Sequence, residues 1–215
     1  MRPDRPLPVV FVFHGFRADA ADLRAGAGWA VLAAREGFIA VHPEGHDDVR
    51  LLGTVGRGWD MEPGETRDLE MVRALLDRLE AERCVDRRRV FATGMSNGGF
   101  FANLVGCGLA TQIAAVAPVA GARPLPGCTP ARPLPILLLH GRADRVIDPG
   151  LARDARDWWA RANRCTGAVT VDGCEHQQGC AADVVLCEGG QGHAWPADAT
   201  GRIWEFFRAH PRPAG

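Results

Sequence analysis

The stretch Val90-Phe-Ala-Thr-Gly-Met-Ser96-Asn-Gly-Gly-Phe-Phe101 decides the expected fold. A short β-branched and apolar run ends in a G-x-S-x-G pentapeptide, residues 94–98, and a helix-like segment follows at once. This order of strand, sharp turn and helix is that of a nucleophile elbow, in which a strained turn pushes the hydroxyl of Ser96 out of the sheet. The flanking glycines have no Cβ to collide with neighbouring backbone. A glycine-rich turn without chemistry is the competing interpretation, and the position between strand and helix argues against it.

The composition of the chain predicts a single domain over residues 1–215. This length can bury a substantial core, and 47% hydrophobic against 24% charged residues is ordinary for a globular protein. The formal net charge of -1 gives no indication of a nucleic-acid partner, and the chain has no apolar run of about 18 residues that would predict a membrane span. All 25 basic residues are arginine, which excludes Schiff-base chemistry and a P-loop lysine.

Apolar runs alternate with segments of helical periodicity along the chain. We expect strands at residues 7–13, 38–41, 90–93, 113–119, 136–140 and 184–187. We expect helices at residues 23–35, 66–82, 100–109, 154–162 and 203–209, and loops at 43–64 and 123–135. Continuous apolar strands that alternate with helices predict an α/β fold with a mostly parallel sheet flanked by helices.

Two later strand ends supply the partners that a nucleophilic serine needs. Such a serine needs a base, and the base needs an acid to orient it, in the chain order Ser, Asp, His on this type of fold. Asp144 lies in the first turn after the strand at 136–140 and is the favoured acid. Asp148 is the alternative, although it directly precedes a Pro-Gly pair and can instead cap the next helix. His193 lies in a glycine-rich loop after the last strand and is the expected base.

Backbone amides near the serine predict an oxyanion hole. We expect the N–H of Asn97, at the start of a helix, and the N–H of Phe16, in the loop after the first strand, to hold the developing oxyanion. His14 and His140 are expected to shape loops. Tryptophans are candidates for an aryl or sugar pocket, although tryptophan is at least as often a core residue. Trp59 and Trp195 lead this group, which also includes Trp158 and Trp159.

At this point the chain resembles a known family, the polyhydroxybutyrate depolymerase and feruloyl esterase group of α/β-hydrolases. The resemblance is carried in family order by residues 8–15, 85–99, 114–121, 139–144 and 192–196, with G-M-S-N-G-G and G-H-A-W-P as the most specific motifs. It implies an α/β-hydrolase fold and secreted or periplasmic ester hydrolysis, with Ser96, Asp144 and His193 at the triad positions. Two features depart from the family pattern. The strands that usually precede Leu7 are expected to be missing, and Phe16 stands where a cysteine is usual.

Seven cysteines, four of them between residues 165 and 187, are typical of an exported protein with disulfides. No apolar leader segment precedes the first strand. Family members tend to have cysteines at similar places, so the resemblance implies the disulfides Cys107–Cys128 and Cys165–Cys180. Of the three remaining cysteines at least one must be free or pair between chains. Seven reduced thiols, as in a cytosolic enzyme, are the alternative. A metal site at Cys174, His176 and Cys180 is not expected, because their spacing matches no standard zinc pattern.

The sequence therefore predicts a serine carboxylic-ester hydrolase that works through an acyl-enzyme without metal or organic cofactor. Its expected substrate is a small-molecule or polymeric ester: polyester oligomers, aryl esters of plant cell wall sugars, or acetyl groups on polysaccharides. An acyltransferase or peptidase on the same fold is an alternative. So is an inactive binding module, which would have no reason to keep all three triad residues.

Overall fold

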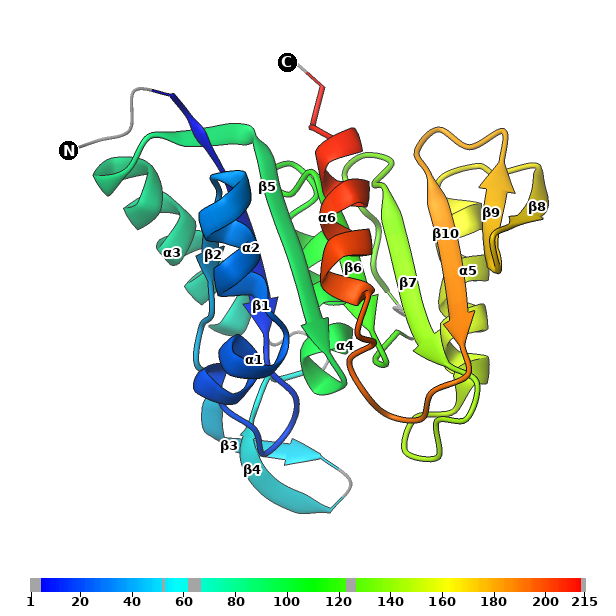
Figure 1. Ribbon diagram of the computed structural model, residues 1–215, viewed down its shortest axis with the longest axis horizontal. Coiled ribbons are helices and arrows are strands. Elements are labelled where there is room, and N and C mark those ends of the chain that lie inside the picture. The colour runs from blue at the N-terminus through cyan, green and yellow to red at the C-terminus, as the bar shows by residue number, and fades with distance from the viewer. Residues whose placement is uncertain (1–4, 52, 62–66, 123–126, 214–215) are drawn as a thin grey trace.

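An eight-stranded sheet forms the centre of the protein, for which the computed structural model describes residues 5–51, 53–61, 67–122 and 127–213 (Figure 1). In chain order the strands of this sheet are β1 (Leu7–Phe13), β2 (Ile39–Val41), β5 (Val85–Met95), β6 (Ala115–Val119), β7 (Ile136–Gly141), β8 (Gly167–Val171), β9 (Cys174–Gln178) and β10 (Val184–Gly189). Their spatial order is β2-β1-β5-β6-β7-β10-β9-β8. The first six pair in parallel, and β9 and β8 extend the sheet as an antiparallel hairpin.

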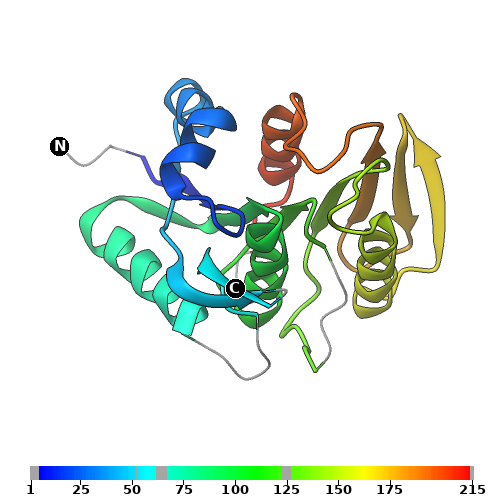
Figure 2. The same cartoon turned by 90° about the horizontal axis from the view of Figure 1, so that it is seen from below.

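Helices cover both faces of the sheet (Figure 2). One face carries α1 (Ala20–Gly26), α2 (Trp29–Glu36) and α6 (Ala199–Ala209), and the other carries α3 (Arg67–Glu82), α4 (Asn97–Gly108) and α5 (Pro149–Ala162). A separate cluster of buried apolar side chains lies under each layer. The predicted α/β fold, a mostly parallel sheet flanked by helices, is confirmed. Among the helices in the described ranges, none combines the length and apolarity needed to cross a membrane.

The parallel strands place their carboxyl ends at one edge of the sheet, the lower edge in Figure 1. The loops after β1, β5, β7 and β10 therefore all begin at this edge. In open α/β sheets, ligands bind outside the carboxyl ends of the strands. Every sequence-predicted triad and oxyanion residue lies in one of these loops or at the start of the helix that follows.

Two expectations for the chain between β1 and α3 are wrong. The single helix expected over 23–35 is two helices, because Gly28 between them has a left-handed φ of 71° that interrupts the helix. The loop expected over 43–64 contains an antiparallel hairpin, β3 (His46–Leu51) and β4 (Thr54–Gly58). Most of its side chains are exposed or half-buried, so it has no apolar alternation to predict it. Residue 66, the expected start of the next helix, lies outside the described residues.

Disulfides join the segments around the last three strands and the end of α4. Cys107–Cys128 and Cys165–Cys180 are confirmed, with Cα–Cα distances of 6.4 and 4.0 Å. A third bridge, Cys174–Cys187, ties β9 to β10 and is not predicted by the sequence. Cys84 is the free cysteine. The alternative of seven reduced thiols is therefore wrong for this structure.

Candidate active site

Ser96 occupies the turn between β5 and α4 in a strained backbone conformation. Its φ of 56° and ψ of -123° lie in a region that non-glycine residues rarely adopt. The turn is held by the Ser96 N–H, which donates to the carbonyl of Val119 at 2.9 Å. A Cβ on Gly94 would lie 2.6 Å from the carbonyl oxygen of Phe13, and one on Gly98 would overlap the same oxygen. Strain and close approach of this kind are features of functional turns.

Asp144 and His193 are brought together across two neighbouring strand ends. Asp144 follows β7 and His193 follows β10, and the His193 Nδ1 lies 2.8 Å from Asp144 Oδ2. The Asp144 carboxylate is buried, and the His193 side chain is 18% exposed. Among the described contacts none joins Ser96 to His193. Catalytic hydrogen bonds are often long in unliganded enzymes and tighten when substrate binds.

The surroundings of Asp144 keep its carboxyl ionised. Burial of this carboxyl opposes ionisation, but hydrogen bonds from the Ile147 N–H, His193 and the Val146 N–H outweigh burial and hold its pKa below the ordinary value. Asp148, the alternative acid, instead caps α5 by accepting the Gly150 N–H at 2.8 Å. Of the two carboxylates, only Asp144 contacts His193 among the described contacts.

His140 lies next to the Asp144–His193 pair, whereas the sequence predicts only that it shapes a loop. Its side chain is 1% exposed, and its Nε2 lies 3.1 Å from the Ile147 carbonyl and 3.3 Å from Asp144 Oδ2. Nε2 therefore carries the hydrogen that Ile147 accepts, an assignment made from the hydrogen-bond network. Through these contacts His140 fixes the loop that presents Asp144.

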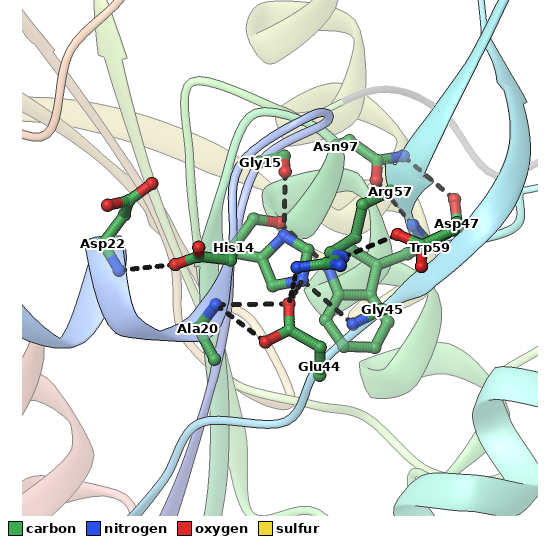
Figure 3. A network of polar contacts seen from close by, with 11 residues as sticks. His14, Gly15, Ala20, Asp22, Glu44, Gly45, Asp47, Arg57, Trp59 and Asn97 are labelled. Carbon is green, nitrogen blue, oxygen red and sulfur yellow. Dashed lines mark hydrogen bonds and ion pairs between the residues drawn. The ribbon is translucent and has the colours of Figure 1, made fainter.

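The loop after β1 lies beside Ser96. Its start is held by contacts of His14, which Figure 3 shows. A Cβ on Gly15 would lie 3.5 Å from the Cβ of Ser96, so the loop that contains Phe16 passes directly next to the serine. The His14 ring is fully buried, accepts the Gly45 N–H at Nε2 at 2.9 Å and donates from Nδ1 to the Gly15 carbonyl at 2.8 Å. Glu44 also approaches His14 Nε2, at 3.2 Å. This confirms the loop-shaping role expected for His14.

The β3–β4 hairpin and Trp59, which directly follows it, are hydrogen-bonded to Asn97 and to Arg17, the neighbour of Phe16. The buried Asn97 side chain accepts the Trp59 N–H at 2.7 Å and donates to the Trp59 carbonyl at 3.0 Å. The Arg17 N–H, next to Phe16, donates to the Arg57 carbonyl of β4 at 2.7 Å. The Asn97 N–H opens α4, where backbone donors have no intrahelical partner. Sequence reasoning predicts a role for the backbone amide of Asn97 and does not predict the contacts of its side chain with Trp59.

Of the four tryptophans expected near substrate, Trp59 and Trp159 are completely buried, and Trp158 and Trp195 are half-buried. Trp59 is 0% exposed, stacks on Phe101 at 5.0 Å and donates from its indole to the His14 carbonyl, which is the placement of a core residue. Trp195 is half-buried and donates to Thr200 Oγ1 at 2.9 Å. Trp159 is also 0% exposed.

The cysteines of the Cys174, His176 and Cys180 group are engaged in disulfides. The described residues contain no group of three or more His, Cys, Asp or Glu that could hold a metal ion. Cys174 and Cys180 each belong to a disulfide, so neither offers a thiolate.

Solved structures define the class of this fold. Acetyl xylan esterase from Aspergillus awamori matches with a TM-score of 0.75 and 14% identity, covering 96% of this chain and 91% of that chain. SOBER1 from Arabidopsis thaliana matches with a TM-score of 0.70 and 18% identity, covering 94% and 98% of the two chains. At these identities the likeness shows the fold alone, and that fold is the predicted α/β-hydrolase fold.

Sequence relatives identify the family. The profile of the family described as Esterase PHB depolymerase matches residues 4–125, more than half of the 215 residues. Feruloyl esterase B from Piromyces equi is 30% identical over 244 aligned positions that cover 98% of this chain. The chain therefore belongs to the Esterase PHB depolymerase family, as the resemblance implies. The chain spans 43% of the length of feruloyl esterase B.

Proposed function

We propose that this protein is a serine hydrolase of carboxylic esters, with residues 1–215 as one catalytic domain. Ser96 is the nucleophile, His193 the general base and Asp144 the acid that orients it. The Asn97 and Phe16 amides form the oxyanion hole. The observation that carries the proposal is the hydrogen-bonded Asp144–His193 pair at the same sheet edge as the strained turn of Ser96. Ser96 is also the only serine in the chain, so no second serine competes for the role.

The chemistry follows from the positions of these groups. Ser96 Oγ attacks the ester carbonyl while His193 Nε2 takes its proton, and the oxyanion forms between the two amides. His193 then protonates the leaving alcohol, and the acyl group remains on Ser96. Water, deprotonated by His193, releases the acid and restores the serine. The ionised Asp144 keeps the proton of neutral His193 on Nδ1 and stabilises the imidazolium that forms in each step.

The relatives support esters as the substrate class. Names such as feruloyl esterase B, 30% identical to this chain, indicate aryl or acyl esters as the first compounds to test. The expected pocket tryptophans give little further guidance, because Trp59 and Trp159 are completely buried. The three disulfides support an oxidising compartment as the place of action.

Hydrolysis and labelling assays test the proposal together. The purified chain should release p-nitrophenol from p-nitrophenyl acetate, and a panel of methyl ferulate, acetylated xylan and poly(3-hydroxybutyrate) should then identify the preferred acyl and alcohol groups. A fluorophosphonate should add one mass increment to the intact chain, located at Ser96. No hydrolysis of any ester and no adduct would leave a binding module as the better interpretation.

A further inference from the structure

A groove of about 440 Å³ lies away from the candidate catalytic site, between residues 128–133 and the last turn of α5. α5 begins at Pro149, next to the loop that carries Asp144, and its 14 residues extend over about 21 Å. Figure 1 shows that the helix runs from the lower to the upper edge of the sheet. The groove is thus at the edge opposite Ser96, and its volume is within the range of small-ligand sites, roughly 300–1,000 Å³.

The wall of the groove is positively charged. Its ten lining residues include three arginines and no carboxylate. Arg132 serves the fold, because its guanidinium donates to backbone carbonyls of residues 110, 113, 114 and 133. Arg161 and Arg164 are exposed, and within the described ranges no hydrogen bond or ion pair engages either guanidinium group. Two planar donor groups therefore face the groove region without a partner.

An indole stands beside these two arginines. Trp158 is half-buried and packs edge-on against the buried ring of Trp159 at 4.7 Å, which fixes its orientation. Trp158 and Arg161 are three positions apart in α5, so they occupy the same face of the helix. An aromatic face next to guanidinium groups suits a ring that bears an anionic substituent.

The opposite wall is rigid. The disulfide Cys107–Cys128 anchors the start of the 128–133 segment to α4, and contacts of Arg132 with the carbonyls of residues 110, 113 and 114 hold its end. Prolines at positions 130 and 133 restrict the backbone further. A groove with a fixed wall needs little reorganisation to bind a ligand, which reduces the entropic cost of binding.

The backbone conformation at position 164 does not account for an arginine there. It follows the end of α5 with φ 58°, a left-handed conformation that favours glycine or asparagine. An arginine near a helix C-terminus interacts favourably with the helix dipole, which is the competing explanation for Arg161 and Arg164. A ligand-binding role and a helix-dipole role predict different effects on ligand binding, and the variant Arg164→Gly distinguishes the two.

We propose that this groove binds a ring that carries a carboxylate, with the carboxylate on Arg161 and Arg164 and the ring against Trp158. The site is separate from the catalytic one and does not depend on the proposed esterase activity. Uronic acid sugars and phenolic acids are the two sources of this chemistry. The guanidinium groups recognise the anion in both, and the indole stacks on either ring.

Nuclear magnetic resonance of the Trp158 indole N–H tests binding at this groove. The wild-type protein is used, because none of the probes contains an ester bond, and the resonance is assigned with Trp158→Phe. The probes are glucuronate and 4-hydroxycinnamate, with xylose and 4-hydroxycinnamyl alcohol as their uncharged counterparts. We expect a saturable shift with at least one anionic probe and a much weaker response to the uncharged ones. No shift of Trp158 up to about 10 mM ligand, or a shift of Trp195 alone, would overturn the proposal.

Variants of the two arginines distinguish binding from a stabilising role. Arg161→Gln and Arg164→Gly should each weaken binding of the anionic probe about tenfold, the effect of losing a hydrogen bond to a charged group. Arg164→Gly should leave the melting temperature unchanged or raise it, because glycine relieves the left-handed conformation. Arg73→Gln, an exposed arginine on α3, is the control for net charge and should leave binding unchanged. Equal binding in all of these variants would show that the arginines do not form a site.

Discussion

The two halves of the candidate site are supported by two hairpins of different kinds. The nucleophile half, at the ends of β1 and β5, is attached to β3–β4 by hydrogen bonds from Asn97 and Arg17. The acid–base half, at the ends of β7 and β10, is flanked by β8–β9, where Cys174–Cys187 and Cys165–Cys180 provide covalent links. Neither hairpin contains a proposed catalytic side chain.

This difference suggests that the hairpins serve different purposes. Buried hydrogen bonds to a peptide fix the position of a nearby group within fractions of an ångström, which matters for the oxyanion hole. Disulfides stabilise mainly by restricting the unfolded chain and need not orient anything. We therefore expect damage at β3–β4 to lower turnover and damage at β8–β9 to lower stability.

The largest expected effect on turnover is that of Ser96→Ala, which removes the proposed nucleophile. Turnover of p-nitrophenyl acetate should fall by about four orders of magnitude or more, because the acyl-enzyme can no longer form. Thermal unfolding should change little, since the substitution removes one hydroxyl and leaves the glycines of the turn in place. Turnover above a tenth of the wild-type value would show that Ser96 is not the nucleophile.

The acid–base half is tested by a matched pair of carboxylates. Asp144→Asn should lower turnover on the order of a thousandfold or more, because the amide favours the wrong His193 tautomer. Asp148→Asn keeps a side-chain oxygen that can accept the Gly150 N–H, so it should change both stability and turnover little. Steady-state kinetics and denaturant unfolding of both variants measure the two effects. The reverse ranking of the turnover losses would assign the acid role to Asp148.

The sequence predicts the central parallel strands and helices well because they are continuous apolar or periodic segments. It misses both hairpins, for a common physical reason. The side chains of β8 are all exposed, and those of β3 are exposed or half-buried except Val49. Neither strand therefore has the alternation that indicates a buried face. One local signal exists for β8–β9: Asp172-Gly173, with φ of 49° and 75°, is the turn that joins tight hairpins.

The sequence predicts those features of the candidate site that depend on the order of the strand ends. It does not predict the features that depend on packing between distant segments. The positions of Ser96, Asp144 and His193 follow from which strand each residue ends. The contacts of Asn97 with Trp59 join residues far apart in the chain through a hairpin that the pattern does not reveal. Trp59 shows the same limit: a large aromatic residue near the site is buried core rather than pocket wall.

An intermediate effect is expected from Asn97→Ala, which releases β3–β4 from the start of α4. We expect turnover to fall about a hundredfold, the cost of a displacement of about 1 Å at reacting groups. The KM should change little, and a boronic acid that mimics the tetrahedral intermediate should bind more weakly in the same proportion as turnover.

Asn163→Ala is the matched control for this effect. The buried Asn163 side chain accepts the Leu134 N–H at 3.1 Å and donates to the Leu134 carbonyl at 2.7 Å, the same pairing of an amide with a peptide, beside the groove edge of the sheet. Asn163→Ala should lower the free energy of unfolding by about as much as Asn97→Ala does. It should leave turnover near the wild-type value. If both variants lose turnover equally, the Asn97 link is structural only.

The smallest effect on turnover is expected from removal of Cys174–Cys187, the bridge between β9 and β10. The double variant Cys174→Ala/Cys187→Ala should lower the free energy of unfolding by about 3 kcal/mol, because the bridge closes a loop with a sequence separation of 13. Turnover should stay within about a factor of two, since the Asp144–His193 contact is made through β7 and β10 and their parallel pairing remains. Cys84→Ala, which removes the free thiol, is the control and should change neither quantity. A loss of turnover comparable to that of Asn97→Ala would mean that β8–β9 also orients the site, and the division of roles between the two hairpins would then be wrong.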